Sequence, residues 1–165
     1  MKSKKVTFGL LIFYLIALTW IIIFKLEFSF DNLPHMRNIN LIPFSQSVIT
    51  NGKIDLSEIV QNALSFIPYG LFVQILWEEK SLLKRFIPII CTSVMFEVIQ
   101  FIFAIGASDI TDIISNSLGG IIGVAIAVSI SKVLRTGWIK FINIISFIGA
   151  VILTVLIVIL LWINM

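Results

Sequence analysis

Acidic and amide side chains gather in one stretch of an otherwise apolar sequence. Glu97 and Gln100 are three residues apart, and Asp112 and Asn116 are four apart, so each pair shares a face if its segment is helical. Asp109, three residues before Asp112, would join the second pair. Side chains of these types can bind an amine or sugar hydroxyls, hold a divalent cation through oxygen ligands, or act as general acid and base.

The chain that carries these side chains is too apolar for a soluble domain. Of its 165 residues, 59% are hydrophobic and 13% are charged, and the mean hydropathy is +1.09. Soluble domains average about 45–50% apolar and about 25% charged residues. A chain this short has too little interior to hide that much apolar surface from water. We therefore expect an all-α integral membrane protein, with residues 1–165 forming a single domain in contact with membrane lipids.

Several function classes are disfavoured by the same composition. One Cys and one His provide neither a disulfide framework nor a zinc site with several His or Cys ligands. The net charge is +3, but the basic residues are scattered at the ends of apolar segments rather than clustered. We therefore expect no nucleic-acid partner.

Five apolar segments are long enough to cross a bilayer as helices, for which about 20 residues suffice. They are residues 6–24, 59–77, 86–103, 110–131 and 141–163. Nine of the twelve Lys and Arg residues lie at the N-terminus, in the second loop and in the fourth loop. Because cytoplasmic loops retain Lys and Arg, this distribution predicts a cytoplasmic N-terminus and an extracytoplasmic C-terminus.

This topology places the acids in the outer leaflet, together with Asn62 near the outer end of the second helix. An acid within a membrane span costs about 2.5–3.5 kcal/mol, so it normally faces the bundle interior and has a partner. For Asp109 and Asp112 there is an alternative, because acids also suit the positive N-terminal end of a helix. Small residues that favour close helix packing continue on the same face of the fourth helix and direct the acids inward. They are Gly119, Gly120, Gly123 and Ala127.

The first loop, residues 25–58, is too apolar for a solvated connection. We expect it to lie at the membrane interface or to enter the membrane as a re-entrant hairpin, with residues 40–44 at its turn. Asn40 would then lie near the polar side chains, and Arg37 would reach the carboxylates or bind an anionic head group. His35 is interpreted as an interfacial residue.

The order of several motifs resembles the VanZ family. The matching pieces are residues 14–15 to 25–26, Arg37 before Asn-Leu-Ile-Pro-Phe at 40–44, Asn62 with 66–70, and the stretch 96–112 running on to Asn116 and Gly119-Gly120. The resemblance implies a small multi-pass protein of the bacterial cell membrane that lowers susceptibility to teicoplanin, an acylated glycopeptide antibiotic. It also implies an accessory place beside the enzymes that rebuild cell-wall precursors.

Two functions fit these residues. The favoured one is non-enzymatic: an outer-leaflet polar cavity binds the head group of a lipid, a lipid-linked cell-wall precursor or the lipoglycopeptide. Its ligand-binding residues would be Arg37, Asn40, Asn62, Glu97, Gln100, Asp109, Asp112 and Asn116.

The alternative is an intramembrane enzyme acting on a lipid-linked substrate of the cell envelope. Glu97 would be the general base, and Asp109 with Asp112 would be the acid partner or the ligands of a divalent cation. No catalytic signature such as GxSxG or HExxH is present in the sequence, and we expect no other cofactor.

Overall fold

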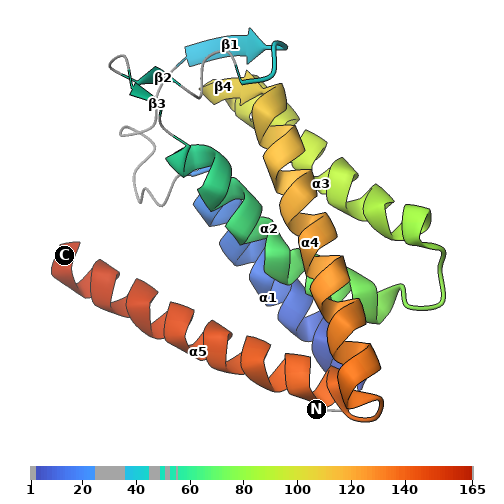
Figure 1. Cartoon of the computed structure of the whole chain (residues 1–165). Coiled ribbons are helices and arrows are strands. Elements are labelled where there is room, and N and C mark those ends of the chain that lie inside the picture. Colours follow the sequence, from blue (N-terminus) through green and yellow to red (C-terminus); the bar gives the residue numbers. More distant parts are fainter. Residues whose placement is uncertain (1–2, 25–35, 45–48, 51–52, 55, 165) are drawn as a thin grey trace.

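Five helices, each long and apolar enough to cross a membrane, form most of the computed structural model, which describes residues 3–24, 36–44, 49–50, 53–54 and 56–164. The helices are α1 (Lys4–Ile22), α2 (Ser57–Leu76), α3 (Leu82–Phe103), α4 (Ile110–Leu134) and α5 (Trp138–Asn164). Four short strands accompany them: β1 (Met36–Asn40), β2 (Ile49–Thr50), β3 (Lys53–Ile54) and β4 (Ile105–Asp109). The expected set of five membrane-spanning helices is confirmed (Figure 1).

Helices α2 and α4 approach each other closely because glycines line their contact. A Cβ atom on Gly119 would overlap the carbonyl oxygen of Ala63, and one on Gly123 would overlap that of Ile67. On α2, a Cβ atom on Gly70 would overlap the carbonyl oxygen of Gly120. The predicted small-residue face of α4 is therefore its packing face, as small residues allow between membrane helices.

Helices α1 and α3 complete the bundle through aromatic contacts with α2. The buried ring of Phe66 packs edge-on against Tyr69 and against Phe96 of α3, with centroids 5.9 and 6.1 Å away. On the other side, the Tyr14 hydroxyl of α1 donates a hydrogen bond of 2.6 Å to the Ser65 carbonyl. These contacts fix α1 and α3 against α2.

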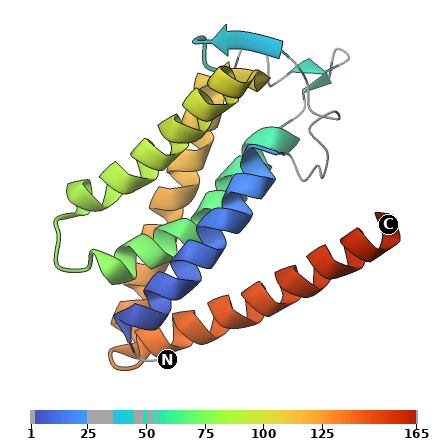
Figure 2. The ribbon, with the colours of Figure 1, turned by 180° about the vertical axis from the view of Figure 1, so that it is seen from behind.

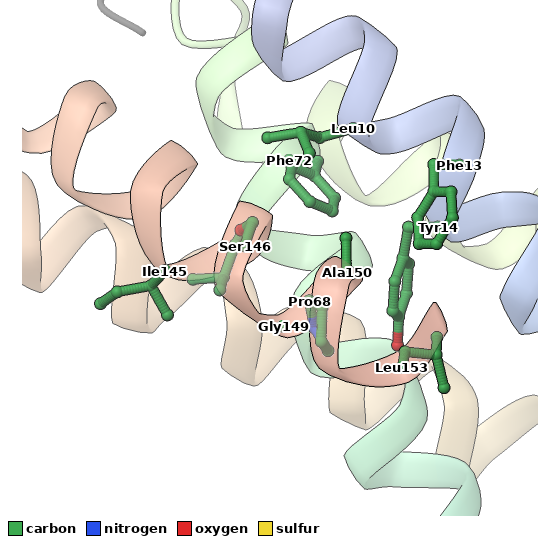
Figure 3. Close-up of a pocket in the computed structure, with 11 residues that line it drawn as sticks. Leu10, Phe13, Tyr14, Pro68, Phe72, Ile145, Ser146, Gly149, Ala150 and Leu153 are labelled. Atoms are coloured by element: carbon green, nitrogen blue, oxygen red, sulfur yellow. The ribbon is translucent and has the colours of Figure 1, made fainter. Parts of the chain in front are cut away.

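Among the described residues, helix α5 packs against the bundle near its first turns. Trp138 and Ile142 are buried there, and the Thr7 hydroxyl donates a hydrogen bond of 2.9 Å to Asn143 Oδ1. Beyond this point α5 diverges from α1 and α2, as the view from behind shows (Figure 2). The divergence leaves an apolar cavity of about 260 Å³ between these three helices (Figure 3).

A parallel strand pair closes the end of the bundle where α3 ends and α4 begins, which we call the strand end (Figure 1). Strand β1 pairs with β4 in the register Met36 with Ile105 and Asn40 with Asp109. Residues between the third and fourth expected spans thus form a strand. Helix α3 stops at Ala104, whose φ of 55° is left-handed, and the chain continues in extended conformation beside β1.

The described part of the first loop lies across the strand end. Leu41, Ile42 and Phe44 follow β1 and are exposed, which fits an interfacial segment better than a re-entrant hairpin. The expected position of His35 falls outside the described residues.

Gly119→Ala should destabilise the protein by about 2 kcal/mol, because the added methyl meets the backbone of Ala63 and cannot be accommodated by a side-chain rotation. Thermal unfolding of the purified protein in detergent measures the effect. Gly9→Ala is the matched control, since nothing lies within 4 Å of its Cβ position. Equal unfolding temperatures for the two variants would contradict the close α2–α4 contact.

Candidate functional site

The antiparallel helices α3 and α4 bring their polar side chains together at successive turns. The Asn116 amide donates a hydrogen bond of 3.1 Å to the Ser93 hydroxyl. Glu97 lies one turn after Ser93 on α3, and Asp112 lies one turn before Asn116 on α4, so these two acids are also neighbours. Both Asp112 and Asp109 lie close enough to repel the negative charge of Glu97. We call Ser93, Glu97, Gln100, Asp109, Asp112 and Asn116 the polar cluster.

Glu97 is the buried centre of this cluster, with 4% of its surface exposed. Its Oε2 atom accepts a hydrogen bond of 2.9 Å from the backbone N–H of Asp109. The Ser108 hydroxyl donates to the Glu97 carbonyl at 2.8 Å. Both donors belong to β4. The left-handed conformation of Ala104 reverses the chain direction after α3, so β4 lies beside the last turns of that helix. The strand thus supplies one hydrogen bond to the buried carboxylate and one to the backbone of the same residue.

Asp109 is the N-cap of α4 and uses both of its carboxylate oxygens. Its Oδ1 accepts from the backbone N–H of Thr111 at 2.7 Å, as N-cap residues commonly do. Its Oδ2 accepts from the Asn40 amide at 2.9 Å. The helix-end role considered for this residue is therefore present, together with a contact to β1.

The segment after β1 is also bonded to the start of α4. The backbone N–H of Phe44 donates to the Thr111 hydroxyl at 3.0 Å, and that of Ile42 donates to Asn40 Oδ1 at 3.1 Å. Residues 36–44 consequently cover the polar cluster from the strand end.

Deeper in the cluster, some buried oxygen atoms accept no hydrogen bond from any described residue. They are Glu97 Oε1, Gln100 Oε1 and Asn116 Oδ1. Gln100 and Asn116 have only 3% and 0% of their surfaces exposed. The amide nitrogen of Gln100 is already used, because it donates to the Ile22 carbonyl of α1 at 3.2 Å.

Arg37 does not reach the carboxylates. Its Nη2 atom donates to the Ile102 carbonyl at 3.1 Å, and its guanidinium lies 5.9 Å from the centre of the Phe101 ring. The side chain therefore interacts with the C-terminal turn of α3, where exposed carbonyl groups favour a cation. In the part of the chain that is described, the ion pair found joins Lys4 to Glu78, at the opposite end of the bundle.

The remaining predicted residue, Asn62, is buried in α2 next to Ala63. The Ala63 carbonyl packs against Gly119 of α4, and Gly119 lies one turn after Asn116. Within the described ranges, no group of three or more His, Cys, Asp or Glu side chains is arranged to hold a metal ion.

Sequence reasoning missed Ser93 and Thr111. Ser93 lies four residues before Glu97 and Thr111 lies between the two aspartates, and these spacings are the signals that could have indicated them.

Comparison with known proteins identifies the chain's relatives. A family model described as VanZ/LLP1 matches residues 11–135, which include every member of the polar cluster. The chain belongs to the VanZ family. Protein VanZ of Enterococcus faecium is 36% identical over 158 residues, which cover 94% of this chain and 93% of that protein. No solved structure matches this VanZ-family chain.

Three cavities formed by described residues of this VanZ-family protein lie away from the polar cluster. The apolar cavity between α1, α2 and α5 is lined by residues such as Tyr14, Phe72 and Leu153 (Figure 3). A second cavity continues along α1 and α5, and a third lies beside Trp138 where α5 begins. The polar cluster itself is packed between α3, α4 and residues 36–44.

Asn40→Ala should lower the stability of the protein by about 1.5–3 kcal/mol, the range for a hydrogen bond to a charged group. The substitution leaves Asp109 Oδ2 without its donor and frees residues 41–44 from one of their anchors. Asn38→Ala is the matched control, because Asn38 lies exposed on the same strand. If both substitutions lowered the unfolding temperature equally, the contact between Asn40 and Asp109 would contribute nothing to stability.

Proposed function

We propose that this VanZ-family protein resides in the bacterial cell membrane and lowers susceptibility to teicoplanin-type glycopeptides by binding a head group at the polar cluster. The observation that carries the proposal is the burial of Glu97 in a membrane-spanning helix with one carboxylate oxygen lacking any described partner. An acid is costly at this depth, and such residues in membrane proteins usually serve function.

The distribution of basic residues supports an external position for this cluster. The described Lys and Arg residues of the predicted cytoplasmic segments lie at the start of α1, and within or beside the connections from α2 to α3 and from α4 to α5. These points are all at the end opposite the strand end (Figure 1). Under the positive-inside rule the strand end faces outward, which gives the polar cluster access to lipids, lipid-linked precursors and drug in the outer leaflet.

A binding role suits the cluster better than catalysis by Asp109. Both oxygens of this carboxylate already accept hydrogen bonds from Thr111 and Asn40, so its position is fixed by the fold. A divalent cation bound by the acids remains the alternative ligand.

Glu97→Gln and Asp112→Asn should each abolish resistance while leaving membrane abundance near that of the unaltered protein. Asp109→Asn should also abolish resistance, with some loss of abundance because Asn cannot accept from both Thr111 and Asn40. The amides retain side-chain shape, and Asn is also a good N-cap, but the charge is removed. Inhibitory concentrations of teicoplanin with parallel immunoblots of membranes measure the two quantities. Glu79→Gln is the control, since Glu79 is exposed at the opposite end. Resistance retained in all three variants would make the acids purely structural.

Expression of the chain should raise the inhibitory concentration of an acylated glycopeptide more than that of a glycopeptide without an acyl chain. The reason is that a site within the outer leaflet acts on molecules concentrated there by their acyl chain. Dilution assays in one susceptible host, with and without expression, provide the measurement. An equal shift for both drugs would contradict a site that acts in the leaflet.

A further inference from the structure

The unpartnered atoms of the polar cluster are all acceptors. Ile22 contributes a carbonyl, which can only accept, so Gln100 must turn its amide nitrogen toward α1 and keep its oxygen within the bundle. Asn116 likewise uses its amide nitrogen on Ser93. Glu97 has one oxygen on the backbone of Asp109 and one without a described donor. Whatever occupies this position must therefore bring hydrogen-bond donors.

The residues that carry the three acceptors lie at successive turns of α3 and α4. Gln100 is one turn from Glu97 on α3 and extends to the Ile22 carbonyl of α1, and Asn116 lies opposite Ser93, one turn from Glu97 in the other direction. Gln100 and Asn116 are therefore on opposite sides of Glu97 along the helix axis. The nearby carboxylates of Asp112 and Asp109 make the electrostatic potential at this point negative.

These properties select among head-group chemistries. Phosphate and carboxylate groups bring only negative charge and acceptors, and Arg37, which would have suited them, lies instead on the C-terminal turn of α3. A trimethylammonium group is positive but has no N–H donor. A primary ammonium group has three N–H donors, no acceptor and a positive charge, and its hydrogen bonds to a carboxylate are charge-assisted.

Resting on the function proposed above, we propose that the polar cluster binds a primary ammonium group, with Glu97 as its counter-ion and the amide oxygen of Gln100 as an additional acceptor. Two sources carry this chemistry: the amine of an outer-leaflet lipid head group, and a soluble amine arriving from the external medium.

Binding of lipids that differ only in methylation of the amine tests this assignment. The full-length protein, purified in detergent, is titrated with phosphatidylethanolamine, its N,N-dimethyl derivative and phosphatidylcholine of identical acyl chains, and native mass spectrometry gives the affinities. We expect phosphatidylethanolamine to bind at least about tenfold more tightly than phosphatidylcholine, since one well-made charged hydrogen bond corresponds to that factor or more. Competition by glycerophosphoethanolamine at equal strength would identify a soluble amine as the source.

Glu97→Gln should remove the preference for phosphatidylethanolamine, whereas Glu79→Gln should retain it. Gln100→Met is a second variant, which deletes one amide acceptor and should reduce the preference without removing the Glu97 charge. Equal affinity of the unaltered protein for all three lipids would overturn the assignment, as would stabilisation by Mg²⁺ alone that depends on Glu97.

Resistance assays separate the two proposals. If Glu97→Gln abolishes resistance while the unaltered protein binds all three lipids equally, the ammonium assignment is wrong and the proposed function stands. If Glu97→Gln changes neither resistance nor lipid preference, both proposals are wrong.

Discussion

The hydrogen bond from the Asp109 backbone N–H to the Glu97 carboxylate determines the architecture of the strand end. A carboxylate at this depth has little water available to it, so protein groups must provide its donors. Helix α4 could not provide this donor from its interior, because interior N–H groups are used within the helix. The N–H comes instead from the last residue of β4, where the chain passes from strand to helix. The left-handed Ala104, strand β4 and its pairing with β1 all serve to place this residue beside α3.

Helix α4 packs against two other helices at once. Its glycines bring it into backbone contact with α2, and Asn116 connects it to Ser93 of α3. Gly120 also lies against the Ile89 side chain of α3, so one short stretch of α4 contacts both helices. Movement of α4 away from α2 would therefore also disturb the distance between Glu97 and Asp112. The close glycine packing of the bundle and the geometry of the polar cluster depend on the same helix position.

Much of this arrangement could be predicted from the sequence. Apolar length located all five helices, and helical spacing together with the glycines indicated that the α4 acids face inward. Strand β4 was missed because Ile105–Asp109 is short and contains three small residues, and its partner residues in β1 lie 69 positions earlier in the chain. The Arg37 contact has a related origin: charge favours either the carboxylates or an anionic head group, whereas strand register places Arg37 opposite Gly106, within reach of Ile102. Helical spacing describes one element, while pairing between distant segments depends on tertiary structure.

Helix α5 differs from the other four in its relation to the site. The family match ends at residue 135, before α5 begins at Trp138, and the polar cluster lies entirely within the matched part. Helix α5 is attached through Trp138, Ile142 and the bond between Thr7 and Asn143, and its remaining length diverges beside an apolar cavity. Apolar walls need no protein partner in a bilayer, since acyl chains are as apolar as the side chains themselves. The buried contacts of α5 with the described part of the bundle therefore lie near its start, whereas the polar cluster requires α3, α4 and β1 to be fixed together.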